Sequence, residues 1–434
     1  MFVVLVFIYC LLFEWRVFDW HIVKLYTVIL KFCIPLALFY FIMANKSKLV
    51  FPSGIVSEYF FILLVFQLWM FVPSFFSADS YECILQCFKY CFRFVFFVSI
   101  LLYFYNYVDK ELKLLRLLVF VGVFSVLQFF ILQIFWWLNM QGEPISLLGA
   151  ESDLYGPMGM LGYQQARMYF SGFSGAILRL TGYWLEPSNA SGFLFCFAFI
   201  AYGFFERFKI KKMFTWASTC FVGGILCLSL AGYLACGASL LLGCCKNKEK
   251  SGLKSAGILV FGCALMLIAI FGRSFVVNTS NDNVFLKAVT GVRENVAEYS
   301  QYSVSGGRFD LLKYNFQLSL KKPLGVGVYI PGEAKGVKSF RKAFPGALVY
   351  WLAVTGYIGV IMLLLVVFLF VRIFCVYDLS RWSKRLFQGW FVLLIQQSVY
   401  GYWMSPLILM LGIFFLVSCQ REQVAPRFKS INYN

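Results

Sequence analysis

Charged residues are scarce in this chain of 434 residues. Asp, Glu, Lys and Arg together make up 13% of it, about half the share found in soluble domains. Hydrophobic residues make up 61%, and apolar runs long enough to cross about 30 Å of hydrocarbon as helices recur along the whole sequence. A soluble fold is therefore excluded, and residues 1–434 are predicted to form one all-α integral membrane domain.

Histidine and metal-binding patterns are also lacking. His21 is the only histidine, and no Cys and His residues have the spacing of metal ligands, which disfavours zinc chemistry and a histidine base. No Asp-x-Asp pair or Gly-x-x-x-x-Gly-Lys loop occurs, which disfavours a sugar nucleotide held through a divalent ion and the binding of nucleotide phosphates. We therefore expect no metal or other cofactor, and the substrate itself must carry the energy for any reaction.

Twelve apolar stretches are predicted to span the membrane. Six basic segments fall on one side of this arrangement, as the positive-inside rule requires, so both termini are predicted to be cytoplasmic. The 14 cysteines lie almost all within apolar runs and are interpreted as small packing residues. The predicted spans are 1–13, 22–43, 59–76, 84–108, 114–138, 188–205, 213–229, 231–245, 256–272, 346–371, 386–400 and 403–419, and the basic segments are 46–48, 109–116, 206–212, 246–250, 381–385 and the tail from Arg421.

Two long segments, 139–187 and 273–345, lie on the opposite, outward side, where functional residues are expected. The first has a net charge of −2 and the second a net charge of +6. An outward segment this basic departs from the usual charge asymmetry, which favours an anionic partner such as a lipid-linked phosphate or an acidic glycan, and not nucleic acid. The lipid bilayer is the other expected partner.

The stretch RLTGYWLEPSNASGF, residues 179–193, leads into the sixth predicted span. Pro187 suits the first turn of a helix, and Ser188 or Asn189 can cap its free amides. The positive end of the helix dipole would face outward and favour an anion, which Arg179 is close enough to share. In the alternative interpretation, Glu186 caps its own helix and Arg179 extends to lipid headgroups.

The stretch SGGRFDLLKYNFQLSLKKPLGVG, residues 305–327, has apolar residues at helical spacing and predicts an amphipathic helix near 308–320. Two lysines, Lys321 and Lys322, close this helix at its negative end. The glycines before Arg308 would let a phosphate oxygen approach the first amides, where the arginine offers a fork of donors. The alternative is a helix on the membrane surface with the arginine in water.

Cations also occur within the predicted spans. Lys89 and Arg93 lie one helical turn apart near the outer end of the fourth span, and Lys24 and Lys31 share one face of the second. They either extend to the outer membrane interface or form a cationic wall for a lipid phosphate.

Three stretches in this order resemble the O-antigen polymerase and O-antigen ligase superfamily of bacterial envelopes: RLTGYWLEPS at 179–188, GGRFDLLKYNFQLSLKKPLGVG at 306–327 and FPGALVYWLAVTGYIG at 344–359. The resemblance covers most of the chain, including the twelve spans and the paired outward loops, and implies a GT-C-like polymerase and ligase architecture. The ligase branch has a histidine eleven residues before the first glycine of the last motif, a position that Pro345 occupies in this chain. The chain therefore resembles the polymerases.

The resemblance implies that the chain joins undecaprenyl-diphosphate-linked oligosaccharide units at the periplasmic face of the bacterial inner membrane, releasing undecaprenyl diphosphate without a metal. Arg179 and Arg308 would stabilise the leaving diphosphate, and Glu186 would act as base, with Asp310 or substrate-assisted proton loss as alternatives. A regulator of chain length is a further expected partner. The other expected substrate contacts are Arg167, Lys89, Arg93, Lys313, Lys321, Lys322 and Arg341.

Three other functions stay open at the level of sequence. A flippase for lipid-linked oligosaccharides would also need cations in its spans, although it has little use for a long basic outward loop. A polyprenyl-phosphate-sugar transferase would place its acids in the first outward loop, where Glu14 and Asp19 lie. The third is a ligase that has lost or moved its histidine.

Overall fold

The computed structural model of the chain describes residues 1–14, 21–46, 49–77, 80–138, 167–169, 176–178, 180, 187–227, 229–244, 315–328, 347–400 and 405–429. Helices make up most of this part, and four helical segments in it are long and apolar enough to cross a membrane. These segments are Ile55–Phe75, Ser80–Asn106, Asn189–Phe208 and Leu348–Val376. The described part of the chain is thus a predominantly helical protein suited to a membrane, as the composition predicts.

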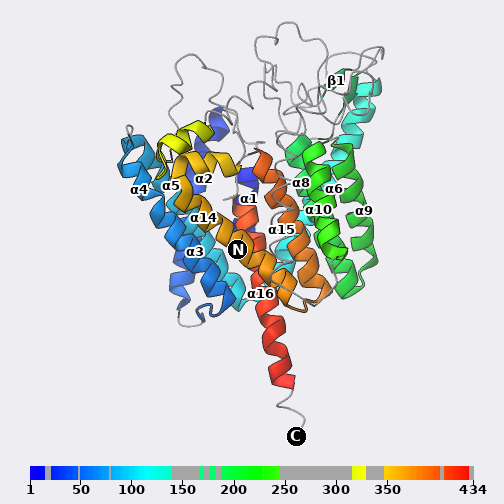
Figure 1. Cartoon of the computed structure of the whole chain (residues 1–434). Helices are drawn as coiled ribbons and strands as arrows, with labels where there is room; N and C mark the ends of the chain where they lie inside the picture. Colours follow the sequence, from blue (N-terminus) through cyan, green and yellow to red (C-terminus); the bar gives the residue numbers. More distant parts are fainter. Residues whose placement is uncertain are drawn as a thin grey trace.

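The helices follow the predicted spans (Figure 1). A helix lies over every predicted span except 256–272, which lies outside the described residues. Two short strands, β1 (Arg167–Tyr169) and β2 (Ala176–Leu178), pair antiparallel within the segment 139–187, a pairing that the apolar pattern does not predict. The helices are α1 (Phe2–Glu14), α2 (His21–Ala44), α3 (Ile55–Trp69), α4 (Phe71–Phe75), α5 (Ser80–Asn106), α6 (Val108–Leu138), α8 (Pro187–Phe208), α9 (Lys211–Leu226), α10 (Leu230–Cys244), α14 (Ala347–Val376), α15 (Arg381–Tyr400) and α16 (Pro406–Lys429).

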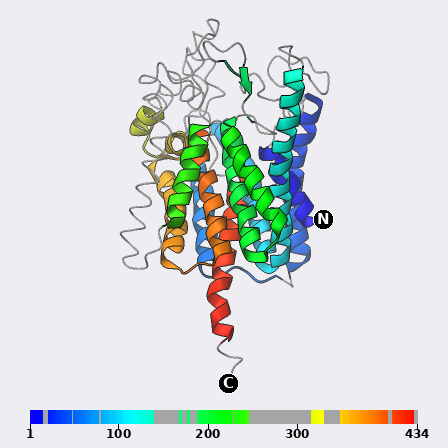
Figure 2. The same ribbon diagram turned by 90° about the vertical axis from the view of Figure 1, so that its right-hand side faces the viewer.

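Several helices are longer than the apolar stretches that predict them. Helix α16 continues to Lys429, ten residues past its predicted end, and projects below the rest of the bundle (Figures 1 and 2). A helix satisfies its own backbone hydrogen bonds, so it does not have to stop where apolar residues give way to polar ones. Hydropathy therefore locates these helices but not their ends.

The core of the molecule lies around α15 and α16. Every side chain from Leu386 to Ser398 and from Ser405 to Cys419 is buried. Helix α15 packs against α8, α10, α14 and α16, so its glutamines and serines face other helices and not the surroundings. A helix that is buried on all sides is expected at the centre of a large bundle.

Several chain segments meet at the end of the bundle that contains Asn106, the last residue of α5. We name this end of the bundle the basic end. The backbone N–H of Val50 donates to Asn106 Oδ1 at 2.9 Å. Arg421 donates to the carbonyls of Phe104 and Tyr105 at 3.0 and 2.9 Å, while the ring of Phe2 packs edge-on against that of Phe104. The start of α1 and the later turns of α16 therefore approach the same end of the bundle. The side of the membrane to which this end belongs stays a prediction.

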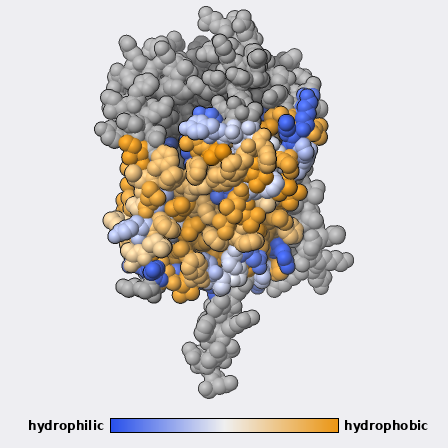
Figure 3. All heavy atoms as spheres, turned by 90° about the vertical axis from the view of Figure 1, so that its left-hand side faces the viewer, coloured by the Kyte–Doolittle hydropathy of each residue, from blue (hydrophilic) through white to orange (hydrophobic). Residues whose placement is uncertain are grey.

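Apolar side chains cover the middle of the face of the molecule shown in Figure 3, and we call this band the apolar belt. Large exposed hydrophobic residues occur on α2, α3, α5, α6, α9 and α14. Apolar patches of this extent are unusual on proteins surrounded by water and fit contact with lipid. The described helices thus carry an apolar outer surface that is suited to a membrane.

Candidate functional site

The predicted site residues divide into two groups. Five of them, Arg179, Glu186, Arg308, Lys313 and Arg341, lie outside the described residues, so their predicted roles stay predictions. Arg167 belongs to β1, without a description of its side chain. The structure describes Lys89, Arg93, Lys321 and Lys322. It also describes the elements that follow or adjoin the three motif stretches, and these elements define the candidate site.

The first motif stretch ends in the first turn of α8, which begins at Pro187 as predicted. Asn189 does not have the predicted role of helix cap, because it lies inside the helix. Its side-chain Oδ1 accepts a hydrogen bond of 2.9 Å from Nε2 of Gln396 on α15. An amide pair that joins the start of α8 to a buried helix fixes the direction in which α8 leaves the site.

Two glycines let α8 come this close to its neighbours. A Cβ atom on Gly192 would lie 2.7 Å from Cγ of Gln396, so only glycine leaves room for the glutamine that holds Asn189. A Cβ atom on Gly232 of α10 would overlap Oγ of Ser191. The first turns of α8 are therefore held from two sides by close helix contacts, in which small residues are typical of membrane proteins.

The second and third motif stretches meet in space. Helix α14 is broken at Gly356, whose φ is 66° and ψ is −169°. The turn at residues 323–327 fills the break: Val326 N–H donates to the Ala353 carbonyl at 3.0 Å, and Gly327 N–H to that of Val354 at 3.1 Å. Tyr357 N–H donates back to the Pro323 carbonyl at 3.0 Å. The turn thus supplies the hydrogen bonds that the broken helix cannot make for itself.

Glycine is required where the turn touches the break. Gly325, Gly327 and Gly356 all have positive φ, a backbone conformation that L side chains rarely adopt. A Cβ atom on Gly325 would overlap the Val354 carbonyl, and one on Gly356 would overlap the Pro323 carbonyl. The Pro-x-Gly-x-Gly spacing and the first glycine of Gly-x-x-Gly therefore belong to one contact, between two stretches that are about 30 residues apart in the chain.

Helices α3 to α5 hold the same unit from the other side. Trp69 Nε1 donates to the Thr355 carbonyl at 2.8 Å, which gives one more carbonyl at the break a partner. The N–H of Val328 donates to Oγ of Ser74 at 3.3 Å, and a Cβ atom on Gly327 would lie 2.8 Å from Sγ of Cys83. We call residues 323–328 together with the break at Gly356 the turn–break unit.

The short helix that precedes the turn–break unit packs against the protein with a side that its sequence alone does not identify. Residues 315–321 are helical and overlap the second half of the predicted amphipathic helix near 308–320. Asn315 and Ser319 are buried against the protein, while Phe316 and Leu320 are exposed. Lys321 and Lys322 are also exposed, at the end of the helix as predicted. The apolar side of this helix thus faces away from the protein.

The cations of α5 lie further from the start of their helix than the predicted span 84–108 implies. Because α5 begins at Ser80, Arg93 is at its midpoint, about 20 Å along the helix from either end. Its guanidinium carbon lies 4.6 Å from the centre of the Tyr90 ring. Lys89, one turn nearer the start of the helix, is exposed. An arginine at mid-helix cannot extend to the interface as easily as one near a helix end, which makes this position a functional candidate.

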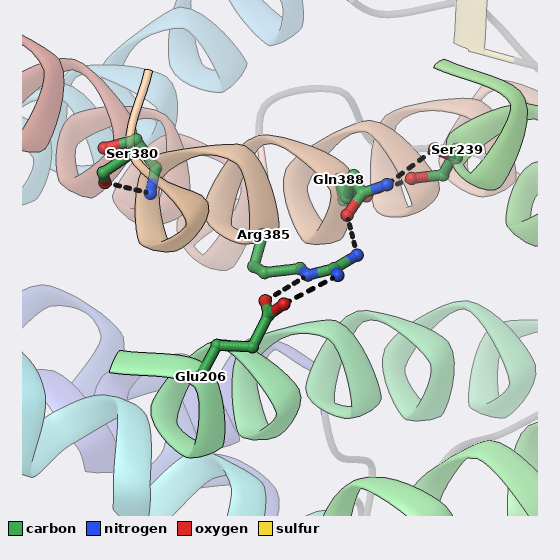
Figure 4. A network of polar contacts seen from close by, with 6 residues as sticks. Glu206, Ser239, Ser380, Arg385 and Gln388 are labelled. Carbon is green, nitrogen blue, oxygen red and sulfur yellow. Dashed lines mark hydrogen bonds and ion pairs between the residues drawn. The ribbon is translucent and has the colours of Figure 1, made fainter. Parts of the chain in front are cut away.

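A polar network joins the last turn of α8 to α10 and α15 (Figure 4). Arg385 donates to Glu206 through Nε at 2.8 Å and through its terminal nitrogen at 3.3 Å. It also donates to Gln388 Oε1 at 2.8 Å, and Gln388 Nε2 donates to the Ser239 carbonyl at 2.9 Å. The guanidinium lies over the Tyr202 ring, 4.7 Å from its centre. This network starts at the last turn of α8, so it holds the helix at the end opposite Asn189.

Comparisons with models of protein families, with curated proteins and with solved structures found no match. The function of the site is therefore argued from its residues and their geometry.

Proposed function

We propose that this protein is a polymerase of a bacterial surface polysaccharide, of the O-antigen polymerase kind. It would lie in the inner membrane with the site on the periplasmic side and the basic end in the cytoplasm. It would join undecaprenyl-diphosphate-linked oligosaccharide units and release undecaprenyl diphosphate. The observation that supports this most is the turn–break unit, in which two of the three stretches that carry the resemblance form one contact through Pro323, Gly325 and Gly356.

The arrangement suits transfer from a diphosphate. The leaving group gains negative charge in the transition state, and fixed cations stabilise that charge without having to reorganise. Arg179 and Arg308 are the proposed diphosphate contacts, each in a chain segment that leads into an anchored element: α8 beyond Arg179, and the turn–break unit beyond Arg308. Glu186 directly precedes α8 and is the proposed base for the acceptor hydroxyl.

The lipid part of the substrate would approach along the apolar belt. Lys89 and Arg93 on α5 are the proposed contacts for its phosphates at membrane depth, where an unpaired anion would be costly. Arg167, Lys313, Lys321, Lys322 and Arg341 are proposed as further cations around the substrate. A regulator of chain length is a proposed partner.

The direct test is reconstitution of the purified protein with lipid-linked repeat units and no energy source. We expect a ladder of longer glycans on the lipid, which is lost in Arg179→Ala and Arg308→Ala. Lys211→Ala is the matched control, because this exposed lysine lies at the first residue of α9, away from the site. If units only change leaflet and no ladder forms, the protein is a flippase and the proposal is wrong.

Glycan banding in a deletion strain separates the remaining candidates. Loss of a polymerase leaves the lipid core with one repeat unit, whereas loss of a ligase leaves none. A ladder that survives both arginine changes but disappears in Glu14→Gln or Asp19→Asn would identify a polyprenyl-phosphate-sugar transferase.

A further inference from the structure

We propose that the helix of residues 315–321 is an in-plane membrane anchor, with Phe316 and Leu320 inserted among the acyl chains of the leaflet on the side away from the basic end. The partner is the phospholipid bilayer itself. This inference rests on the orientation of the helix and is independent of the proposed reaction.

The helix has three sides with different surroundings. Asn315 and Ser319 are 2% and 0% exposed, so a polar side packs against the protein. Phe316 and Leu320 are 51% and 59% exposed, and they lie about 40° apart around the helix axis. Gln317 and Lys321 are also exposed and lie about 100° further around than Phe316 and Leu320.

The polar and apolar sides of this helix are oriented opposite to those of a helix on a water-exposed surface. A helix on a water-exposed surface buries its apolar side and exposes its polar side. Here the side that packs against the protein is polar, and two of the three apolar side chains of the helix, Phe316 and Leu320, are exposed. An interfacial helix needs an apolar side for the acyl chains, beside a polar side with lysine for headgroups and water. Phe316, Leu320, Gln317 and Lys321 provide both.

The neighbouring residues continue the apolar surface. Leu324, in the turn that follows the helix, is 52% exposed. The turn is fixed to Ser74 through the N–H of Val328, and the next two residues of that segment, Phe75 and Phe76, are both exposed. The helix, yellow in Figures 1 and 2, lies at the rim of the bundle and away from the projecting end of α16. Exposed apolar residues therefore occur on the helix, in the turn that follows it and in the segment that the turn contacts.

The turn–break unit fixes the end of this helix relative to the bundle. The hydrogen bonds at Val326, Gly327 and Tyr357 hold the chain directly after the helix. A helix that is fixed at one end and apolar on its outer side can remain in the leaflet without being long. Lys321 and Lys322, at the fixed end, are then placed at the level of the lipid phosphates.

Photocrosslinking of the full chain tests the anchor. The photoreactive residue p-benzoylphenylalanine replaces Phe316, Leu320 or, as matched control, Gln317, and the protein is irradiated in nanodiscs of phosphatidylethanolamine and phosphatidylglycerol. We expect acyl-chain adducts in the mass spectrum from positions 316 and 320, several-fold more than from position 317. Phe75, which is exposed in the same region, is the positive control for lipid contact.

The other outcomes contradict the proposal. Adducts from positions 316 and 320 with a second copy of the chain or with another protein would show that a protein covers this side. Equal and low lipid adducts from 316, 320 and 317, with Phe75 still labelled, would place the helix in water. Because no substrate is present, neither result bears on the polymerase activity.

Discussion

At the scale of single residues, backbone conformation explains the glycines of two motif stretches. Gly325 and Gly356 have positive φ and face each other across a contact that admits no Cβ atom. Such positions restrict a sequence more strongly than burial does, because a buried apolar residue can be exchanged for another of similar volume. The Pro-x-Gly-x-Gly spacing in the sequence indicates a turn, but the partner of that turn is visible only in the structure.

Gly356→Ala should lower the free energy of unfolding by roughly 3 kcal/mol, because strain at positive φ adds to the overlap with the Pro323 carbonyl. The measurement is the thermal unfolding midpoint of the purified protein in detergent. Gly237→Ala is the matched control, since nothing lies within 4 Å of a Cβ atom there, and it should be neutral or stabilising by up to about 1 kcal/mol. Equal midpoints for the two variants would contradict the role of the break.

Glu111 makes stability depend on pH. Burial raises the pKa of this carboxyl from its ordinary value of 4.5 to about 8, with Arg421 and Arg207 opposing the shift. A carboxyl with a raised pKa in the folded state stabilises the fold fully below pH 4.5, and the stabilisation is lost as the pH rises through 8. Glu111→Gln should therefore remove much of the loss of stability between these values. Unfolding midpoints of both proteins at pH 5 and pH 8.5 check this, and parallel curves would refute it.

At the scale of elements, the apolar runs predict the positions of the described helices well, because a membrane helix needs length and hydropathy more than a particular pattern. The break at Gly356, the direction of helix 315–321 and the bond between Asn189 and Gln396 could not be predicted. Each depends on a partner far away in the chain, and the asparagine and glutamine are 207 residues apart. For the same reason, glutamine in an apolar run gives no indication of which helix it will meet.

Asn189 and Gln396 should act as one unit. We expect Asn189→Ala and Gln396→Met each to lower stability and glycan synthesis, with a coupling of roughly 1 kcal/mol between them in a double-mutant cycle. Gln397→Met is the matched control, because this neighbouring glutamine is also buried but does not have Asn189 as its partner, so its effect should add to that of Asn189→Ala within about 0.5 kcal/mol. Additive effects for the Gln396 pair would show that the contact does not position α8.

At the scale of the whole molecule, α8 is held at both ends. Asn189 joins its start to α15, and Glu206 joins its last turn to the same helix through Arg385. Helix α15 and the helices packed against it, α8, α10, α14 and α16, therefore form a fixed frame. The turn–break unit is attached to this frame through α14.

Arg385→Ala should lower the free energy of unfolding by roughly 2 kcal/mol, because Glu206 would be left mostly buried without its cation. The measurement is again the unfolding midpoint. Arg381→Ala, four residues earlier and exposed, is the matched control and should change stability by less than about 0.5 kcal/mol. A similar change in stability for both variants would mean that the ion pair of Arg385 and Glu206 contributes as little as an exposed ion pair does.

The last residue of the turn–break unit, Val328, also contacts the start of α14. Tyr350 donates through its hydroxyl to the carbonyl of Val328 at 3.3 Å, so two chain positions 22 residues apart are joined directly to each other. Val328 and Tyr350 are therefore two adjacent, fixed positions on the described frame. An insertion or deletion between these two positions should therefore leave α14 and α5 in place, because changes of length are tolerated best between adjacent fixed ends of the chain.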